Sequence, residues 1–430
     1  MAVAQAVILC GGLGKRMRPY TDLLPKPMIP VNGRPFLECL VEQLRDQGIT
    51  RIVLLTGYRA AQIESHFGDG HRFGLAITYS QGPVEWDTGR RLWEARTRLD
   101  PRFLLLYSDN FVPFRLSGLL EFHRDKRRML SLLLSAKANG NIKVASDGIV
   151  QHYDQGRSSA DLDHVEIGFM VVERDAVLSL IEDPDISFSR VLARLASCGE
   201  LAGLVCGDHY HSISDPERWK LAEQYLRLKR MLLIDRDGTL NVRPPQAQYL
   251  SRWEDFQWIP GALEGLEALS SAGFSFALIS NQAGIARGIV TLQQVDAINR
   301  RLREELAARG ITMANAYVCP HHWDDGCACR KPAPGLFFQA SHDLLLRLDR
   351  TFYLCDDPRD CRAAYNANSN SVFVGDDEEL SSLRAAERPA YVARTILEAA
   401  PWLKSRFESW EPRPGPTDPG CESEVMLCGQ

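Results

Sequence analysis

Short apolar runs alternate with amphipathic stretches along most of the chain. Buried strands are predicted at Val7–Leu9, Arg51–Thr56, Phe103–Tyr107 and Met129–Leu134, and helices at Phe36–Gln47, Leu116–Lys126 and Pro216–Arg230. Strands that alternate with helices in this way are typical of an α/β layered fold with a mainly parallel sheet.

The same pattern restarts in the second half of the chain. Strands are predicted at Met231–Ile234, Ser275–Ile279, Phe352–Cys355 and Ser371–Val374, and helices at Gly261–Ala272 and Thr291–Arg309. Two units that each begin with a strand predict two Rossmann-like domains, 1–228 and 229–398, with almost no linker. Residues 399–430 become rich in Pro, Gly, Ser and acidic residues, so we expect a loosely ordered tail.

Composition narrows the class of protein. The chain has 430 residues, 45% of them hydrophobic, and a net charge of −5. Mild acidity argues against a nucleic-acid partner, and no apolar run approaches the roughly 20 residues that cross a bilayer. The first residues lack the basic region of a secretory signal. Eleven cysteines in such a chain are expected to be reduced or to bind metal. We therefore expect a cytoplasmic enzyme without a membrane partner.

A glycine-rich loop follows the first predicted strand. It contains Gly11, Gly12 and Gly14 and continues into basic residues that include Arg16. Glycines allow backbone N–H groups to approach phosphate oxygens, although a simple tight turn would use the same residues. Prolines on both sides of Lys26 would hold its ammonium group in a fixed, non-helical position. Together these features favour a phosphate site.

Residues 1 to about 225 resemble the sugar-1-phosphate nucleotidyltransferases that use nucleoside triphosphates. The resemblance implies that the triphosphate is held by Gly11, Gly12, Gly14, Arg16 and Lys26. Asp109, which follows the strand Phe103–Tyr107, would carry Mg²⁺. In this family a sugar 1-phosphate attacks the α-phosphorus of the nucleotide and pyrophosphate leaves, and positioning and charge neutralisation supply most of the catalysis.

Several positions depart from this family's pattern. Ser108 stands where a glycine is usual, and Arg90 and Arg91 replace small residues in the loop that recognises the base. The segment Tyr153–Gly156 occupies the place of a sugar-contacting Glu-Lys pair.

The second metal carboxylate of the family is also missing. Ser212 stands at its position, and a neutral hydroxyl binds Mg²⁺ weakly. Asp208 and Asp215 are the nearby carboxylates that could replace it. These departures leave open a second hypothesis, in which the first domain only binds a nucleotide or sugar phosphate and tethers an active partner.

Two carboxylates follow the first strand of the second half. Asp235 and Asp237 are separated by one residue, so one can attack phosphorus while the other exchanges protons with the leaving group and water. A polar turn or a fragment of a calcium loop is the alternative. Further polar side chains end or follow later strands: Ser280, Asn281, Gln282, Lys331, Asp356, Asp357 and Asp360.

This order of groups resembles the haloacid-dehalogenase-like phosphohydrolases. The resemblance implies that Asp235 is the nucleophile that forms an aspartyl-phosphate and that Asp237 is the general acid and base. Ser280 and Lys331 would bind the transferring phosphoryl group. Mg²⁺ would lie between Asp235, the backbone carbonyl of Asp237 and Asp356, an oxygen set that suits this ion.

A metal-binding pattern lies between these groups. Cys319, His321, Cys327 and Cys329 offer three thiolates and one imidazole within one short loop, which suits tetrahedral Zn²⁺. Scattered buried cysteines or a redox pair are the alternatives. Four protein ligands leave no open position, so the site would be structural and would order the loop that carries Lys331.

The segments Asp235–Asn241 and Asn281–Gly288, together with the zinc loop, look like the D-glycero-D-manno-heptose 1,7-bisphosphate 7-phosphatases. Histidinol-phosphatases are related and remain an alternative. In this family Arg287 and Arg330 would help to select the second, non-reacting phosphate, and Asn281 and Gln282 would also contact substrate. A lysine of the family's last motif is replaced here by Asp357.

The two resemblances fit one reaction sequence. Removal of the 7-phosphate from the heptose 1,7-bisphosphate yields a heptose 1-phosphate, which is a substrate type for a sugar-1-phosphate nucleotidyltransferase. We therefore expect a bifunctional enzyme of nucleotide-heptose synthesis that uses a sugar phosphate and a nucleoside triphosphate. GDP-heptose is favoured over ADP-heptose, without a physical means of deciding from the altered base loop.

Overall fold

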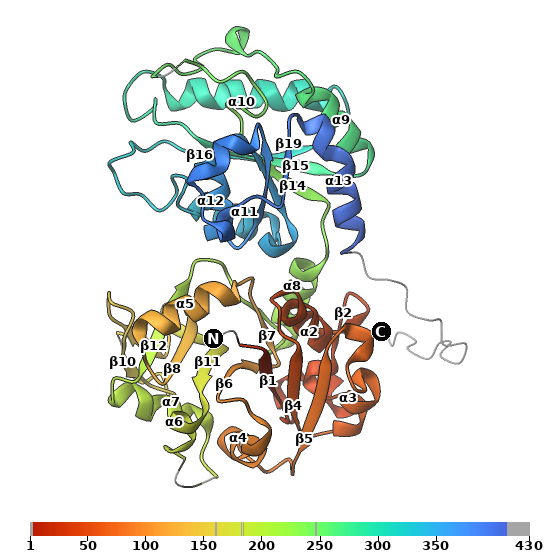
Figure 1. Ribbon diagram of the computed structural model, residues 1–430, viewed down its shortest axis with the longest axis vertical. Coiled ribbons are helices and arrows are strands. Elements are labelled where there is room, and N and C mark those ends of the chain that lie inside the picture. Colours follow the sequence, from red (N-terminus) through yellow and green to blue (C-terminus); the bar gives the residue numbers. More distant parts are fainter. Residues whose placement is uncertain (1–2, 160, 182, 184, 246, 411–430) are drawn as a thin grey trace, which may run out of the picture.

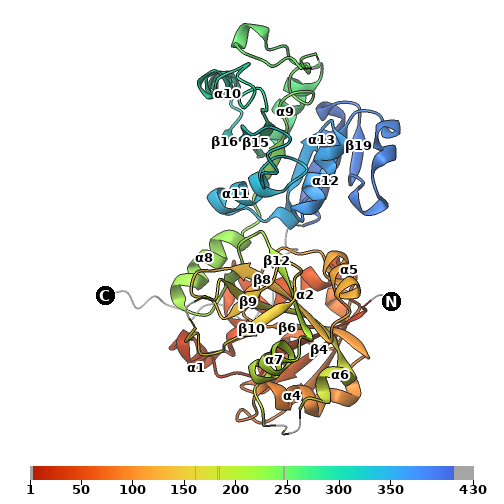
Figure 2. The same cartoon turned by 90° about the vertical axis from the view of Figure 1, so that its left-hand side faces the viewer.

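The computed structural model describes residues 3–159, 161–181, 183, 185–245 and 247–410 (Figure 1). Two α/β domains lie one above the other in both views, and the chain passes from the first to the second after helix α8 (Pro216–Leu226) (Figures 1 and 2). Within the described residues, no helix is both long enough and apolar enough to cross a membrane.

The first domain is built on one large mixed sheet. Its strands are β1 (Gln5–Cys10), β4 (Arg51–Thr56), β5 (Ala76–Gln81), β6 (Arg102–Tyr107), β8 (Leu130–Ala136), β9 (Ile142–Val144), β10 (Val150–Tyr153), β11 (His164–Glu173) and β12 (Leu201–Cys206). The order is β10-β9-β11-β6-β1-β4-β5, and β8 pairs with β11 on one side and with β12 on the other. The expected parallel arrangement runs from β6 to β5, whereas β11 is antiparallel to both β6 and β8.

Helices cover both faces of this sheet. They are α1 (Tyr20–Leu23), α2 (Phe36–Asp46), α3 (Ala60–Phe67), α4 (Thr88–Ala95), α5 (Leu116–Lys126), α6 (Arg174–Leu178), α7 (Phe188–Ser197) and α8, and two small ribbons pair β2 (Pro30–Val31) with β3 (Arg34–Pro35) and β7 (Asn110–Phe111) with β13 (His211–Ser212). Successive side chains of β1 point to opposite faces. Ile8 therefore packs in the core with α2 and α5, and Val7 packs in the core with α4 and α7.

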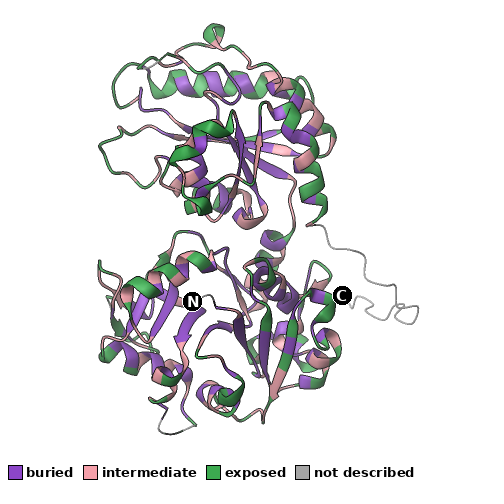
Figure 3. Cartoon of the chain, in the orientation of Figure 1, coloured by how far each residue is buried: buried purple, intermediate pink, exposed green. Residues whose placement is uncertain are grey.

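The second domain has a parallel sheet. Its strands are β14 (Met231–Ile234), β15 (Ser275–Asn281), β16 (Met313–Cys319), β17 (Phe352–Cys355), β18 (Asn370–Val374) and β19 (Tyr391–Ala393), in the order β16-β15-β14-β17-β18-β19. Residues of α9 (Ala262–Ser271), α10 (Leu292–Ala307) and α13 (Ile396–Glu408) pack in one core cluster, and those of α11 (Gly335–Leu344) and α12 (Pro358–Asn366) in another. Buried strands occupy the centre of each domain (Figure 3).

The carboxyl ends of β14, β15 and β17 meet at one edge of this sheet, because parallel strands all end on the same side. Residues that follow these strands in the sequence are thereby brought together. This topology places the predicted chemical groups of the second domain in one site.

The predicted tail, 399–430, is wrong for its first ten residues. Residues 399–408 belong to α13, which begins after the capping residue Thr395. Ala399, Ala400, Leu403 and Phe407 are buried, because they recur at helical spacing on the side that packs against α9. Residues 409 and 410 form a turn after α13, and residues 411–430 lie outside the described part of the chain.

Side chains of both domains meet where the domains touch. The hydroxyl of Ser341 lies 2.9 Å from Asp208 Oδ1, and the guanidinium of Arg347 lies 4.7 Å from the centre of the Phe111 ring. Arg115 donates a hydrogen bond of 3.1 Å to the carbonyl of Tyr365. The interface therefore contains buried polar contacts as well as packing.

Candidate active sites

The first domain contains a cavity of about 620 Å³ at the carboxyl end of β1. The residues predicted to hold a nucleotide and its metal ion all line it: Gly11, Gly12, Gly14, Arg16, Lys26 and Asp109. The structure therefore brings together the residues predicted for the triphosphate and the first metal carboxylate, Asp109.

The loop reaches its shape through Gly14. Its φ of 62° lies in the left-handed region, and a Cβ there would stand 2.9 Å from Thr21 Cγ2 and 3.0 Å from Lys26 Cβ. Lys26 Nζ lies 2.5 Å from Asp109 Oδ2. The two groups expected to meet phosphate and cation are thus paired with each other, and ligands of opposite charge could take the place of each partner.

Arg91 is built into the wall of this cavity. Its buried guanidinium donates hydrogen bonds to the carbonyls of Thr56 (2.7 Å), Pro83 (2.7 Å) and Gly11 (3.4 Å). A Cβ on Gly11 would lie 2.3 Å from Arg91 Cζ, so this close approach requires glycine. Arg90 turns away and pairs with Asp185 at 2.9 Å.

The carboxylates considered as replacements for the second metal ligand have other partners. Asp208 contacts Ser341 of the second domain, and Asp215 accepts a hydrogen bond from the backbone N–H of Arg218, which caps α8. The hydroxyl of Ser212 is 3.1 Å from Arg218 Nη1. Asp208 and Asp215 are both absent from the described residues that line the cavity.

Glu166 lines the cavity and was missed by sequence reasoning. Burial, together with the nearby negative charge of Asp109, raises the pKa of Glu166 to about 8. A single carboxylate inside the apolar run of β11 was the available signal. Its strand partners are far away in the sequence, so its direction could not be read from the pattern alone.

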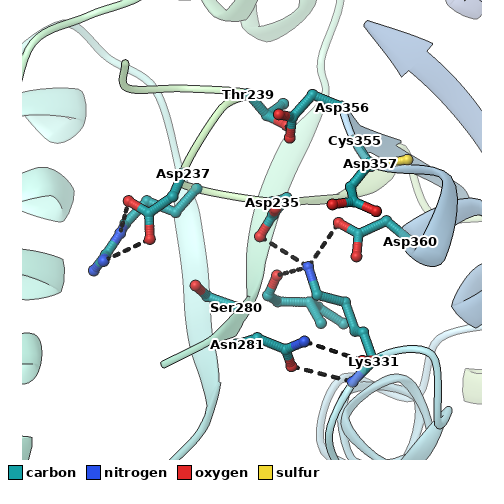
Figure 4. Close-up of polar contacts among 12 residues, drawn as sticks. Asp235, Asp237, Thr239, Ser280, Asn281, Lys331, Cys355, Asp356, Asp357 and Asp360 are labelled. Atoms are coloured by element: carbon teal, nitrogen blue, oxygen red, sulfur yellow. Dashed lines mark hydrogen bonds and ion pairs between the residues drawn. The ribbon is translucent and has the colours of Figure 1, made fainter. Parts of the chain in front are cut away.

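The second site lies at the edge where β14 and β17 end, and Lys331 is at its centre (Figure 4). Its ammonium group is 2.9 Å from Asp235 Oδ1, 2.8 Å from Asp360 Oδ2 and 2.6 Å from the hydroxyl of Tyr353. Burial alone would lower the pKa of Lys331, but Asp235 and Asp360 outweigh it and raise the pKa. A fixed positive charge therefore lies beside the predicted nucleophile.

The carboxylates around Asp235 carry more negative charge than this lysine balances. Burial raises the pKa of Asp235, and burial and Asp235 raise the pKa of Asp356 to about 6. Gly238 has a φ of 100°, and a Cβ there would lie 1.9 Å from Asp356 Oδ2, so the loop and Asp356 approach closely only because residue 238 is glycine. This all-oxygen, electron-rich set is suited to Mg²⁺.

Asp237 does not point toward Asp235 in this structure (Figure 4). Its carboxylate accepts hydrogen bonds from the fully buried Arg236 at 2.9 Å and from Gln282 Nε2 at 2.7 Å. Burial would raise the pKa of Asp237, but Arg236 and the hydrogen bonds lower it. To act as an acid, this side chain must leave Arg236 and turn toward the substrate.

The polar residues at the end of β15 mainly hold other protein groups. The Asn281 amide exchanges two hydrogen bonds of 3.1 Å with the backbone of Lys331, and Gln282 Nε2 donates to Ser280 Oγ at 2.9 Å. Asn281 thus positions Lys331, a role the sequence did not suggest.

The two arginines expected to select a second phosphate differ in their surroundings. Arg287 is exposed, and its guanidinium lies 5.8 Å from the Tyr249 ring centre and 5.4 Å from that of Trp323. Arg330 Nη1 is buried and has no hydrogen-bond partner in the described part of the chain. A buried N–H group without an acceptor lowers stability, so an acceptor atom of a bound anion would be favourable at Arg330.

Positive charge near Asp356 and Asp357 comes from Arg243, in another segment, and from the neighbouring Arg359. Arg243 lies 2.6 Å from Asp356 Oδ2 and 3.6 Å from Asp357 Oδ2, and Arg359 lies 2.6 Å from Asp357. These guanidinium groups compensate for the acidic residue that replaces the family's lysine.

The predicted zinc ligands converge. The ligand atoms of Cys319, His321, Cys327 and Cys329 all lie within 4.8 Å of one another, and the three sulfur atoms are 3.4–3.7 Å apart. A tetrahedron with Zn–S bonds of about 2.3 Å has edges of roughly 3.8 Å. The donor set and spacing could therefore hold Zn²⁺.

Comparison with known proteins gives a different family for each half of the chain. A nucleotidyl transferase family model matches residues 5–157, and a HAD-hydrolase-like model matches residues 328–399. Over 184 residues the chain is 35% identical to the D-glycero-beta-D-manno-heptose-1,7-bisphosphate 7-phosphatase of Yersinia pestis. The matched region covers 41% of this chain and 96% of that protein. Through its second domain, the chain belongs to this phosphatase family.

Two further proteins, a phosphatase and a nucleotidyltransferase, are similar to parts of this chain. The crystal structure of D,D-heptose 1.7-bisphosphate phosphatase from B. bronchiseptica, complexed with magnesium and phosphate, is 27% identical and covers 41% of this chain and 98% of its own, with a TM-score of 0.38. A mannose-1-phosphate guanylyltransferase of Mycobacterium tuberculosis is 29% identical over 220 residues, which are 49% of this chain and 61% of that protein. The chain is an enzyme that joins a nucleotidyltransferase domain to a phosphatase domain, as the sequence predicted.

Proposed function

We propose that this enzyme performs two consecutive steps toward a nucleotide-activated heptose. The phosphatase domain removes the 7-phosphate of D-glycero-D-manno-heptose 1,7-bisphosphate, and the first domain transfers a nucleotidyl group to the resulting heptose 1-phosphate. The observation that carries the proposal is the pairing of Asp235 with Lys331 at the strand edge, in one chain with a glycine-rich cavity that holds Lys26 and Asp109.

In the first step, Asp235 attacks the phosphorus atom and the bond from phosphorus to the C7 oxygen breaks. Asp237 gives its proton to that oxygen after it turns away from Arg236. A water molecule then attacks the aspartyl-phosphate while Asp237 takes its proton, and orthophosphate leaves. Lys331 neutralises charge on the phosphoryl oxygens throughout.

Asp235, Asp356 and the backbone carbonyl of Asp237 would hold Mg²⁺. When bound, the ion supplies a Lewis acid that offsets the charge of the transferring group. Zn²⁺ at the four-ligand loop would be structural and would order the segment that carries Arg330 and Lys331.

In the second step, an oxygen of the sugar 1-phosphate attacks the α-phosphorus of a nucleoside triphosphate, and pyrophosphate leaves. The backbone N–H groups around Gly11 and Gly12, with Arg16 and Lys26, would hold the phosphates, and Asp109 would hold Mg²⁺. The similarity to a mannose-1-phosphate guanylyltransferase supports GTP as the nucleotide.

One observation favours a second candidate, in which the first domain binds ligands without catalysis. Arg91 packs directly against Gly11 and takes up space in the cavity wall.

Phosphorus NMR separates the candidates. Purified enzyme is given Mg²⁺, each anomer of the heptose 1,7-bisphosphate, and GTP, ATP or CTP in separate samples. Orthophosphate followed by pyrophosphate and a nucleotide-sugar diphosphate signal supports both steps and identifies the base. Orthophosphate alone, with heptose 1-phosphate accumulating under every nucleotide, supports the second candidate. Absence of orthophosphate contradicts the phosphatase assignment.

A further inference from the structure

One residue that lines the nucleotidyltransferase cavity has a buried carboxylate oxygen without a partner. Glu166 lines this cavity, and its Oε2 atom is buried and has no hydrogen bond within the described part of the chain. Its other oxygen, Oε1, accepts only a long hydrogen bond of 3.4 Å from the hydroxyl of Tyr153. Since a buried acceptor left unpaired is costly, the arrangement calls for a donor from a ligand.

The fold directs this side chain into the cavity through an irregularity in β11. The pairing of β11 with β8 shifts register between Glu166 and Met170, and Gly168 within this stretch has a φ of 78°. A Cβ on Gly168 would lie 2.5 Å from the Tyr107 ring, so a larger residue would not fit. Bulges of this kind redirect side chains and occur often beside active sites.

The register of β11 against β6 places Glu166 near Asp109. Phe169 pairs with Leu106, and Asn110 Nδ2 donates to the carbonyl of Ile167 at 3.1 Å. The antiparallel contact therefore continues to the residues next to Glu166 and Asp109. The two carboxylates differ in their partners. Asp109 is paired with Lys26, whereas no ion pair to Glu166 occurs among the described residues.

Several neutral polar residues line the same cavity as Glu166. Gln155, Ser187 and Ser189 line the same cavity, which also contains the basic residues of the glycine-rich loop. A ligand that satisfies both kinds of surface carries a phosphate for the basic loop and hydroxyl donors for the carboxylate. A phosphate alone would leave Glu166 Oε2 unpaired.

We propose that Glu166 is the acceptor for hydroxyl groups of the sugar phosphate bound by the first domain. The naming of a sugar phosphate rests on the proposed function, whereas the need for a neutral hydrogen-bond donor rests on the orphan oxygen. In this role Glu166 determines specificity, because it distinguishes a polyhydroxylated phosphate from inorganic phosphate or pyrophosphate.

Calorimetric titration in Mg²⁺-free buffer tests this inference. Heptose 1-phosphate, orthophosphate and GTP are titrated separately into the wild type, Glu166→Gln and Glu166→Ala. At pH 9, above the pKa of about 8 of Glu166, we expect Glu166→Ala to bind heptose 1-phosphate roughly tenfold more weakly, which corresponds to the loss of one hydrogen bond. Glu166→Gln keeps one acceptor oxygen and should lose less, and neither variant should change its affinity for orthophosphate or GTP. Glu121→Gln, which changes an exposed carboxylate on α5 outside the cavity, should bind all three ligands as the wild type does.

Unchanged affinity for heptose 1-phosphate in both Glu166 variants would overturn the inference. So would a loss that appears only when Mg²⁺ is added, because Glu166 would then be a metal ligand. Retained GTP binding shows that the variants are folded. If the wild type forms no nucleotide sugar but the Glu166 variants still lose heptose 1-phosphate affinity, the inference holds and the proposed transfer reaction fails.

Discussion

Replacement of Asp208 by asparagine should remove a pH-dependent loss of folding stability that arises at the contact between the domains. Asp208 lies between β12 and β13, and its Oδ1 is 2.9 Å from the hydroxyl of Ser341 on α11 and 2.8 Å from the N–H of His209. Burial raises its pKa from the ordinary 3.8 to about 7. Its Oδ2 atom is buried and has no hydrogen-bond partner in the described residues.

The direction in which stability changes with pH follows from proton binding. Between pH 4 and 7 the folded protein holds a proton on Asp208 that the unfolded chain has lost, so the free energy of unfolding falls as pH rises. The pKa of Asp208 is about three units higher in the folded protein than in the unfolded chain, and each unit corresponds to about 1.4 kcal/mol. The free energy of unfolding is therefore about 4 kcal/mol lower above pH 7 than below pH 4. Asparagine has no proton to lose, and its Oδ1 retains an acceptor for the N–H of His209 and for the hydroxyl of Ser341.

Urea unfolding followed by tryptophan fluorescence, at pH 5 and pH 7, measures this effect. The stability of Asp208→Asn relative to the wild type should increase by about 2 kcal/mol between the two pH values, because Asp208 is about half titrated at pH 7. Glu121→Gln, on an exposed position of α5, should show no such change. An Asp208→Asn advantage that is the same at both pH values would refute the reasoning. Loss of nucleotidyl transfer in this variant would instead make Asp208 a metal ligand.

Three further predictions concern the phosphatase domain. Asp235→Asn should abolish phosphate release and leave the zinc content unchanged, and substantial remaining turnover in a phosphate assay would contradict its role as the nucleophile. Cys327→Ser should lose zinc, measured by elemental analysis, and lower the melting temperature of this domain; an unchanged melting curve after full loss of metal would argue against a structural site. Gly238→Ala should reduce kcat at least about tenfold, because its Cβ would lie 1.9 Å from Asp356 Oδ2 at a φ of 100°, and full activity would show that the loop adapts freely.

The bounds of the strands that end at the candidate phosphatase site could be predicted closely from the sequence. The predicted and observed bounds of β14 and β17 are identical, since strands buried on both faces are continuous apolar runs. That the four candidate metal ligands lie close together could be predicted for another reason, because all four belong to one short segment. By contrast, residues 399–408 were assigned to a loose tail, since Pro and acidic residues further along hid the helical spacing of Leu403 and Phe407.

The partners of buried charged groups could not be predicted. Asp237 was assigned as an acid and base from its position two residues after Asp235, but its present pairing with Gln282 depends on how β15 lies beside β14. Asp208 was considered for a metal site, and only the packing of α11 against its loop gives it Ser341 as a partner.

The sequence by itself determined two α/β units, the order of polar groups at strand ends and a short segment that contains three cysteines and one histidine. These features depend on residue types at short separations, where chain geometry leaves few alternatives. The tertiary structure decided that Lys331 stands between Asp235 and Asp360, that Arg236 holds Asp237, and that Glu166 faces the cavity. Burial and charge pairing join segments far apart in the chain, so they are fixed only when the sheets and helices pack.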